Sequence, residues 1–197
     1  MSVRSVLIWS GLALAIGAPI TAAAVSPLLA WREPIYIAAG FAGIAGLCIL
    51  LLQPLLIQGA LPGLSDRLGR RIHPFVGGVL VVAVILHVGG LWLTSPPDVV
   101  DALLLVSPTP FSLWGVIAMW ALFAAALLAL FRRRWRLRWT TWRLGHLSLT
   151  TMVVAGTVAH TLLIQGTMES ISKVVLCCLV VLFSLRALAA SIGGVRR

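Results

Sequence analysis

The only histidines in this chain of 197 residues form two pairs with the same spacing. His73 and His87 are 14 residues apart, and so are His146 and His160. On an α-helix, a step of 14 residues advances about 21 Å and turns about 1400°, close to four whole turns. Both histidines of a pair therefore share one helix face, at two levels separated by a distance comparable to the thickness of a membrane core.

This spacing favours a pair of stacked metal centres. Two such helices set side by side would give two levels, each with one histidine from either helix. A neutral imidazole nitrogen can hold haem iron axially, and two imidazoles close both axial positions, so such a centre passes electrons and has no open site. A lone histidine in a membrane helix is also typical of a helix–helix hydrogen bond. The alternative for these four is ordinary packing, but two matched pairs favour ligation.

The composition predicts an all-α integral membrane protein that carries these residues on transmembrane helices. Sixty per cent of the residues are hydrophobic and 10% are charged, and the mean hydropathy is +1.08. Long uncharged runs mark membrane spans, because about 20 apolar residues cross a bilayer as a helix. We expect one domain, residues 1–197, folded as a six-helix bundle with helices at about 6–24, 34–57, 73–93, 111–131, 146–165 and 172–190.

The net charge of +10 does not indicate a nucleic-acid partner, because the basic residues gather on alternate connections. One set comprises Arg4, Arg67, Arg70, Arg71, Arg132, Arg133, Arg134, Arg136, Arg138, Arg143, Arg196 and Arg197, whereas the opposite connections hold only Arg32 and Lys173. This positive-inside pattern predicts a multi-pass protein of the inner (plasma) membrane with both termini in the cytoplasm. Anionic membrane lipid suffices as the partner of the arginine run.

Several further features of the chain have more than one interpretation. The first apolar stretch ends in Ala22-Ala23-Ala24 and imitates a secretory signal, but its length favours a retained helix. Gly77 and Gly156 lie one turn from His73 and His160. They would make room for a flat macrocycle or serve ordinary helix packing. Residues 94–111, rich in proline and apolar side chains, are expected to lie across the outer surface as a lid.

The tryptophans and cysteines have unremarkable explanations. Most of the tryptophans, including Trp135, Trp139 and Trp142 beside the arginine run, are typical of interfacial anchors. An electron-relay role for one of them is the less favoured alternative. Cys48, Cys177 and Cys178 lie within apolar spans without metal-ligand spacing. We expect them to be small core residues without a disulfide framework.

Sequence motifs for an internal source of electrons are absent. The chain has no glycine-rich dinucleotide loop, no phosphate loop, no CxxC pair and no polar segment long enough for a flavin or nicotinamide domain. The expected donor is therefore a separate protein or a membrane quinol.

Residues 47–93 and 142–164 together resemble the ferric reductase-like transmembrane domain. This is the haem-binding membrane part of ferric reductases and NADPH oxidases, and a relative is the haem subunit of the bacterial methionine sulfoxide reductase system. The resemblance lies in two helices, third and fifth of six, each with a histidine pair and a basic turn before it. It covers nearly the whole chain and is strongest over residues 40–165.

The resemblance implies two b-type haems. His73 and His146 would hold the cytoplasmic-side haem, and His87 and His160 the outer one. Haem propionates are anionic, so we expect basic partners for them: Arg70, Arg71 and Arg143 for the inner haem, and Arg32 or Lys173 for the outer one. The chain departs from the better-known members because it lacks their cytosolic flavin and nicotinamide domain.

The predicted function is transmembrane electron transfer through the two haems, from a cytoplasmic or quinol donor to an acceptor on the outer side. The protein would then be the electron-transfer membrane component of an oxidoreductase. One alternative is a quinol-linked haem anchor for a separate soluble oxidoreductase. Another is a non-redox channel or transporter gated by histidines, which predicts a colourless protein.

Overall fold

The computed structural model describes residues 2–193, and this part of the chain is built from helices joined by short connections, without a strand. Six long helices are α1 (Val3–Ala24), α2 (Pro34–Ile57), α3 (Asp66–Thr94), α5 (Pro110–Phe131), α6 (Trp139–Leu163) and α7 (Ser170–Gly193). A short helix, α4 (Pro96–Leu103), and a 3-10 turn, η1 (Pro27–Leu29), lie in two of the connections. The six long helices are each apolar and long enough to cross a membrane, which confirms the predicted helical bundle of a multi-pass membrane protein.

Local sequence explains where these helices begin. Proline occupies the first helical position of α2, α4 and α5, where its fixed φ angle suits a helix and its missing N–H is not needed. The hydroxyl of Ser65 accepts a hydrogen bond from the Leu68 amide and caps α3. Since this cap precedes the apolar run, α3 begins seven residues before the predicted position 73. The start of α6 at Trp139 likewise precedes the predicted 146.

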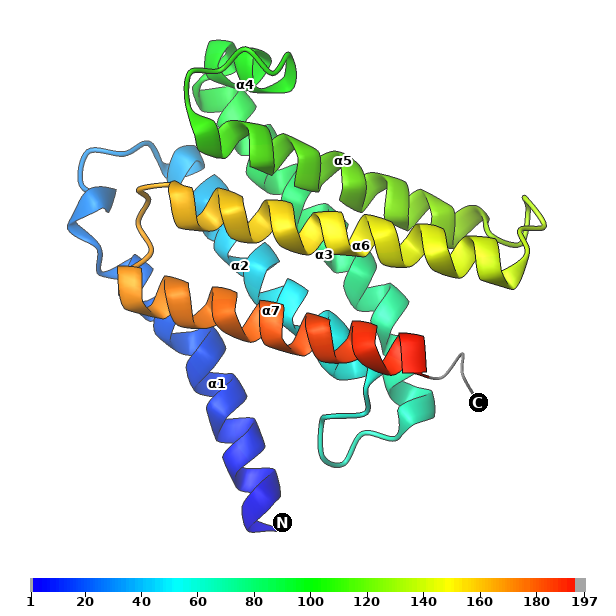
Figure 1. Ribbon diagram of the computed structural model, residues 1–197. Helices are drawn as coiled ribbons and strands as arrows, with labels where there is room; N and C mark the ends of the chain where they lie inside the picture. The colour runs from blue at the N-terminus through cyan, green and yellow to red at the C-terminus, as the bar shows by residue number, and fades with distance from the viewer. Residues whose placement is uncertain (1, 194–197) are drawn as a thin grey trace.

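Two helix pairs dominate the packing. α2 lies along α3, and α5 lies along α6, whereas α3 and α6 make hardly any backbone contact with each other (Figure 1). Glycines permit both close approaches: a Cβ on Gly90 of α3 would lie 2.7 Å from the Cβ of Ala39, and one on Gly156 of α6 would lie 2.9 Å from the Trp114 carbonyl oxygen. Gly156 therefore serves helix packing, one of the two roles considered for it.

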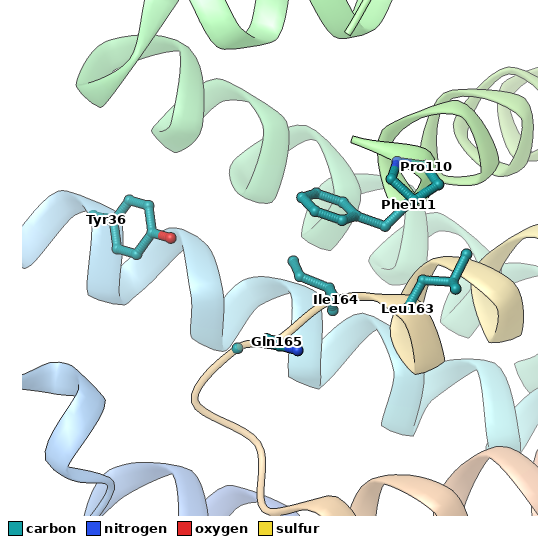
Figure 2. A pocket seen from close by; sticks show the side chains of 7 residues that line it. Tyr36, Pro110, Phe111, Leu163, Ile164 and Gln165 are labelled. Atoms are coloured by element: carbon teal, nitrogen blue, oxygen red, sulfur yellow. The ribbon is translucent and has the colours of Figure 1, made fainter. Parts of the chain in front are cut away.

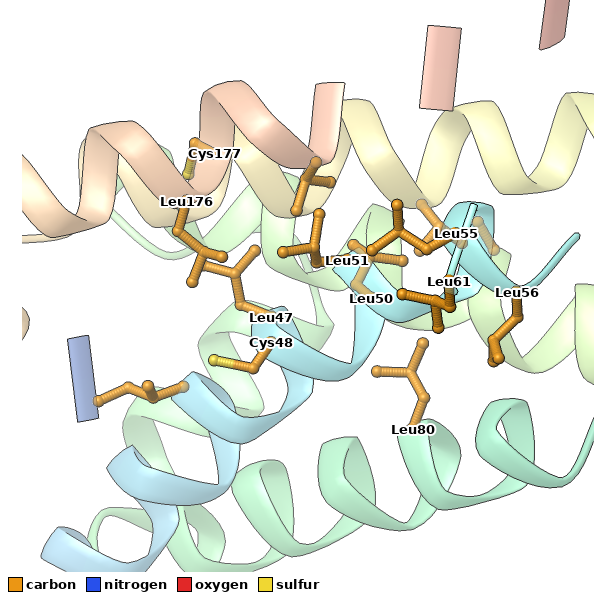
Figure 3. Packing of buried hydrophobic residues seen from close by; sticks show 14 of the residues in the cluster. Leu47, Cys48, Leu50, Leu51, Leu55, Leu56, Leu61, Leu80, Leu176 and Cys177 are labelled. Atoms are coloured by element: carbon orange, nitrogen blue, oxygen red, sulfur yellow. The ribbon is translucent and has the colours of Figure 1, made fainter. Parts of the chain in front are cut away.

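The hydrophobic core is centred on α2. Its leucines, including Leu47 and Leu51, pack against Leu176, Cys177 and Val180 of α7 (Figure 3). Cys48 and Cys177 are buried core residues with free thiols, as predicted, whereas Cys178 is exposed at the protein surface. The expectation of a core position was therefore wrong for Cys178, because it lies on the face of α7 directed away from α2.

The ends of the helices form two groups. Because six long helices alternate in direction, α1 begins and α7 ends on the same side as connections 58–65 and 132–138, where most arginines lie. Arg196 and Arg197 lie outside the described residues. The other side carries connections 25–33, 95–109 and 164–169. We call these the basic end and the opposite end of the bundle.

The connection at 95–109 contains α4, which was not predicted as a helix. Its residues pack against α3 and α5 (Figure 1). The Ser95 hydroxyl donates to the Asp98 carboxylate near the start of α4. The segment lies at the opposite end of the bundle against these two helices, and its role as a lid stays a prediction.

The carboxylate of Glu169, just before α7, accepts hydrogen bonds from the backbone amides of Ser172 and Ile171, each at 2.7 Å. These bonds, chiefly that from Ser172, hold the Glu169 pKa below its ordinary value of 4.5. A carboxyl whose pKa is lower in the folded state than in the unfolded state stabilises the fold above pH 4.5. This stabilisation is lost as the pH falls through the folded-state pKa. We therefore expect acidification below pH 4.5 to lower the melting temperature of the wild type more than that of Glu169→Gln. Equal slopes of melting temperature against pH in detergent would contradict this role.

Candidate functional site

The four histidines meet in two pairs between α3 and α6. The imidazole centres of His73 and His146 are 6.5 Å apart, with their planes at 80°. Those of His87 and His160 are 6.4 Å apart, at 78°. No hydrogen bond joins the two rings of either pair in the described part of the chain. The structure thus brings together the residues that the sequence analysis paired, at two levels along the same helices.

This ring separation suits one metal ion between two imidazoles. Nitrogen-to-metal bonds of imidazole are about 2.0–2.1 Å long, as in zinc sites. Ring bonds near 1.33 Å place the ring centre about 1.1 Å behind the nitrogen. Two imidazoles on opposite sides of one metal ion would then have centres about 6.3 Å apart. The observed 6.4 and 6.5 Å agree with this value.

The pair formed by His87 and His160 has a fixed orientation. The His87 Nδ1 atom lies 2.8 Å from the carbonyl oxygen of Ala39 on α2, and the His160 Nδ1 atom lies 2.8 Å from that of Phe111 on α5. A carbonyl only accepts, so each Nδ1 carries the proton and each Nε2 is left unprotonated. This is the arrangement of metal-ligating histidines, in which the second ring nitrogen donates to a carbonyl or carboxylate.

Two glycines make these hydrogen bonds possible. Gly43 lies four residues after Ala39, and Gly115 lies four residues after Phe111. A Cβ at Gly43 would be 2.9 Å from the His87 Nδ1 atom, and one at Gly115 would be 2.7 Å from the Nδ1 atom of His160. A side chain at either position would displace the imidazole, so both rings of the His87–His160 pair depend on a glycine of the neighbouring helix.

The pair formed by His73 and His146 is held differently. The Nδ1 atom of His146 is buried and has no hydrogen-bond partner, and His73 has the Gln53 backbone nearby but no well-formed hydrogen bond to it. A step of 14 residues along α2 and α5 leads from Gly43 to Ile57 and from Gly115 to Ala129, so the glycines are not repeated at this level.

The donor set at each level consists of two imidazoles. Residues 2–193 contain no group of three or more His, Cys, Asp or Glu side chains that could hold a metal ion. Protein zinc sites commonly use three or four such ligands. Two opposed imidazoles instead suit a metal that brings its own equatorial ligands, as haem does, so the residues present fit haem.

A cavity of about 570 Å³ reaches the His87–His160 pair from the opposite end of the bundle. Apolar residues of α2, α3, α5 and α6 form its inner walls, among them Leu47, Leu80, Val84 and Val153. Toward the opposite end of the bundle its lining is more polar and includes Arg32, Asp98, Asp101, Ser107, Thr109, Gln165, Thr167 and Lys173. A largely apolar, flat group with charged substituents at one edge would match this distribution of apolar and polar lining residues.

A second hollow of about 370 Å³ adjoins this cavity and shares Tyr36, Phe111 and Gln165 with it. Figure 2 shows the Phe111 side chain close to that of Ile164 at this hollow, with Tyr36 further along its edge on α2. The Phe111 ring also contacts the His160 imidazole, with centres 5.8 Å apart. The hollow is therefore separated from His160 by the Phe111 ring.

The predicted propionate partners are only partly gathered at the site. Arg32 and Lys173 both line the cavity that reaches His87 and His160. At the basic end, Arg70 and Arg71 are exposed, and the Arg143 guanidinium donates to the backbone carbonyl of Ser191.

Sequence reasoning missed Gly43 and Gly115 and the two carbonyls that they expose. The small-residue spacing Ala39-x-x-x-Gly43 is a signal of close helix approach, but it does not indicate which side chain approaches. Comparison of the chain with protein-family models, curated proteins and solved structures gives no match.

Proposed function

We propose that this protein is a transmembrane electron-transfer component with two b-type haems, each ligated by one histidine of α3 and one of α6. The observation that supports it most is the geometry of the histidine pairs. Two pairs of imidazoles face each other at 6.4 and 6.5 Å without a hydrogen bond between them. Edge-to-face packing of two rings also allows centres about 4.5–7 Å apart, but ligation of one metal ion per pair accounts for the same separation at both levels.

In this proposal the chain's residues bind and orient the two cofactors. His73 and His146 are the axial ligands near the basic end, and His87 and His160 those near the opposite end. The carbonyls of Ala39 and Phe111 fix the tautomer and rotation of the latter pair, which raises the ligand basicity of Nε2. When bound, the two haems would supply one-electron transfer across the membrane core.

The surroundings of the two levels suggest different tasks for the two ends. The walls around His87 and His160 are largely apolar, and burial of a metal centre among such side chains tunes its potential. With the basic end in the cytoplasm, we propose that a separate donor protein or a membrane quinol delivers electrons there. The acceptor would bind at the opposite end, beside Phe111.

The absorption spectrum tests the proposal directly. Purified from cells supplied with a haem precursor, the protein is expected to show a b-type spectrum that sharpens with dithionite, and a pyridine haemochrome assay is expected to count two haems per chain. A colourless protein would overturn the proposal in favour of a non-redox channel or transporter. One haem per chain would contradict the use of both histidine pairs.

A further inference from the structure

We infer that Trp142 is a positioning residue for His146 and sets the properties of the metal centre at the basic end. This inference rests on the proposed haem ligation by His73 and His146. Trp142 was expected to be an interfacial anchor, and its contact with His146 was not predicted.

The indole of Trp142 and the imidazole of His146 are stacked. Their ring centres are 5.4 Å apart and their planes differ by 9°. The two residues are four positions apart on α6, so one lies a turn above the other on the same helix face. This contact restricts rotation of the imidazole about its bond to Cβ, because a tilted ring would lose the parallel overlap.

No hydrogen bond performs this task for His146. Its Nδ1 atom is buried without a partner, whereas the Nδ1 atoms of His87 and His160 each bond to a backbone carbonyl. The two levels therefore hold their α6 ligands by different means, a carbonyl at His160 and an indole face at His146.

Two other residues, Arg132 and Trp139, contact the Trp142 indole and hold it in place. The Arg132 guanidinium lies over it, 4.4 Å from the ring centre, and also over Trp139 at 4.6 Å. The Trp139 and Trp142 rings are 5.1 Å apart. Cation–π attraction of this kind favours a fixed indole, so Arg132, in the connection between α5 and α6, helps to hold the Trp142 ring against His146.

Two electronic consequences follow for the centre at the basic end. The rotation of an axial imidazole determines its overlap with the iron orbitals and therefore the electron paramagnetic resonance signal of a low-spin haem. A ligand without a hydrogen bond at Nδ1 is also less basic than one with it. Trp142 thus fixes the orientation without increasing the basicity of His146.

The test compares Trp142→Ala, Trp142→Phe and the control Trp135→Ala in the haem-loaded protein. Trp135 lies in the connection just before α6, is 53% exposed, and stacks on Phe131 rather than on a histidine. For Trp142→Ala we expect a shifted or broadened resonance signal and a changed midpoint potential of one haem only. We also expect about two- to twelvefold weaker retention of that haem against a scavenging protein. Trp142→Phe should restore most of these properties, and Trp135→Ala should leave them unchanged.

The possible outcomes separate this inference from the proposed function. A wild type with two haems whose signals are unaltered in Trp142→Ala would overturn the inference alone. An equal change of both haems would also overturn it, because this indicates a general effect on the fold. A colourless wild type would overturn both. Should Trp142→Ala not accumulate, Arg132→Gln is expected to give a smaller shift in the same signal, and no shift would contradict the inference.

Discussion

Replacing His87 with alanine is expected to remove one of the two proposed haems and to leave the other spectroscopically intact. The variant deletes one of two axial ligands at its level, and the remaining ligand, His160, cannot close both axial positions. The other pair lies about 21 Å away along each helix, so its geometry should not change. Haem per chain should fall from two to one in the pyridine haemochrome assay.

The pairing gives this experiment internal controls. His160→Ala is expected to remove the same haem as His87→Ala, and the double variant should lose no more than either single one. His73→Ala and His146→Ala should remove the other haem. Loss of both haems, or of neither, in the single variants would contradict the pairing of residues across α3 and α6.

The arrangement of the bundle was predictable where long apolar runs determine it. The span of α2 was predicted as 34–57 and is observed as Pro34–Ile57, since proline begins it and a polar connection follows it. The early parts of α3 and α6 were missed because they are polar or aromatic helix turns outside the apolar run. Hydropathy measures the part of a helix that lies in lipid, whereas the cap at Ser65 decides where the helix begins.

Only the part of the site that depends on helical periodicity was predictable from the sequence. The step of 14 residues placed two histidines on one face of each helix, and the structure brings those faces together. The contacts made by Nδ1 depend on which helix packs beside α3 and α6, and one sequence contains no signal for that choice. Ala39 is 48 residues from His87, and no local pattern joins them.

The same dependence on neighbouring helices predicts a large effect for a single methyl group at Gly115. A Cβ there would lie 2.7 Å from the His160 Nδ1 atom and 3.0 Å from its Cε1 atom, so Gly115→Ala must displace the ring from the Phe111 carbonyl. Losing an outer hydrogen bond of a metal ligand costs about 10- to 100-fold in affinity. We therefore expect Gly115→Ala to bind the haem of the His87–His160 level at least tenfold more weakly, as measured by haem transfer to a scavenging protein.

Gly43→Ala should weaken the same haem, because its Cβ would meet His87 from α2 at 2.9 Å. The matched controls are Gly40→Ala on α2 and Gly89→Ala on α3, where a Cβ would meet nothing within 4 Å. Gly40→Ala adds the same methyl group to α2 and Gly89→Ala adds it to α3, the helix that carries His87, and both variants should retain both haems. If all four variants weakened one haem alike, helix propensity rather than crowding of the imidazoles would be the cause. If Gly115→Ala instead weakened the haem of His73 and His146, the proposed assignment of glycines to levels would be wrong.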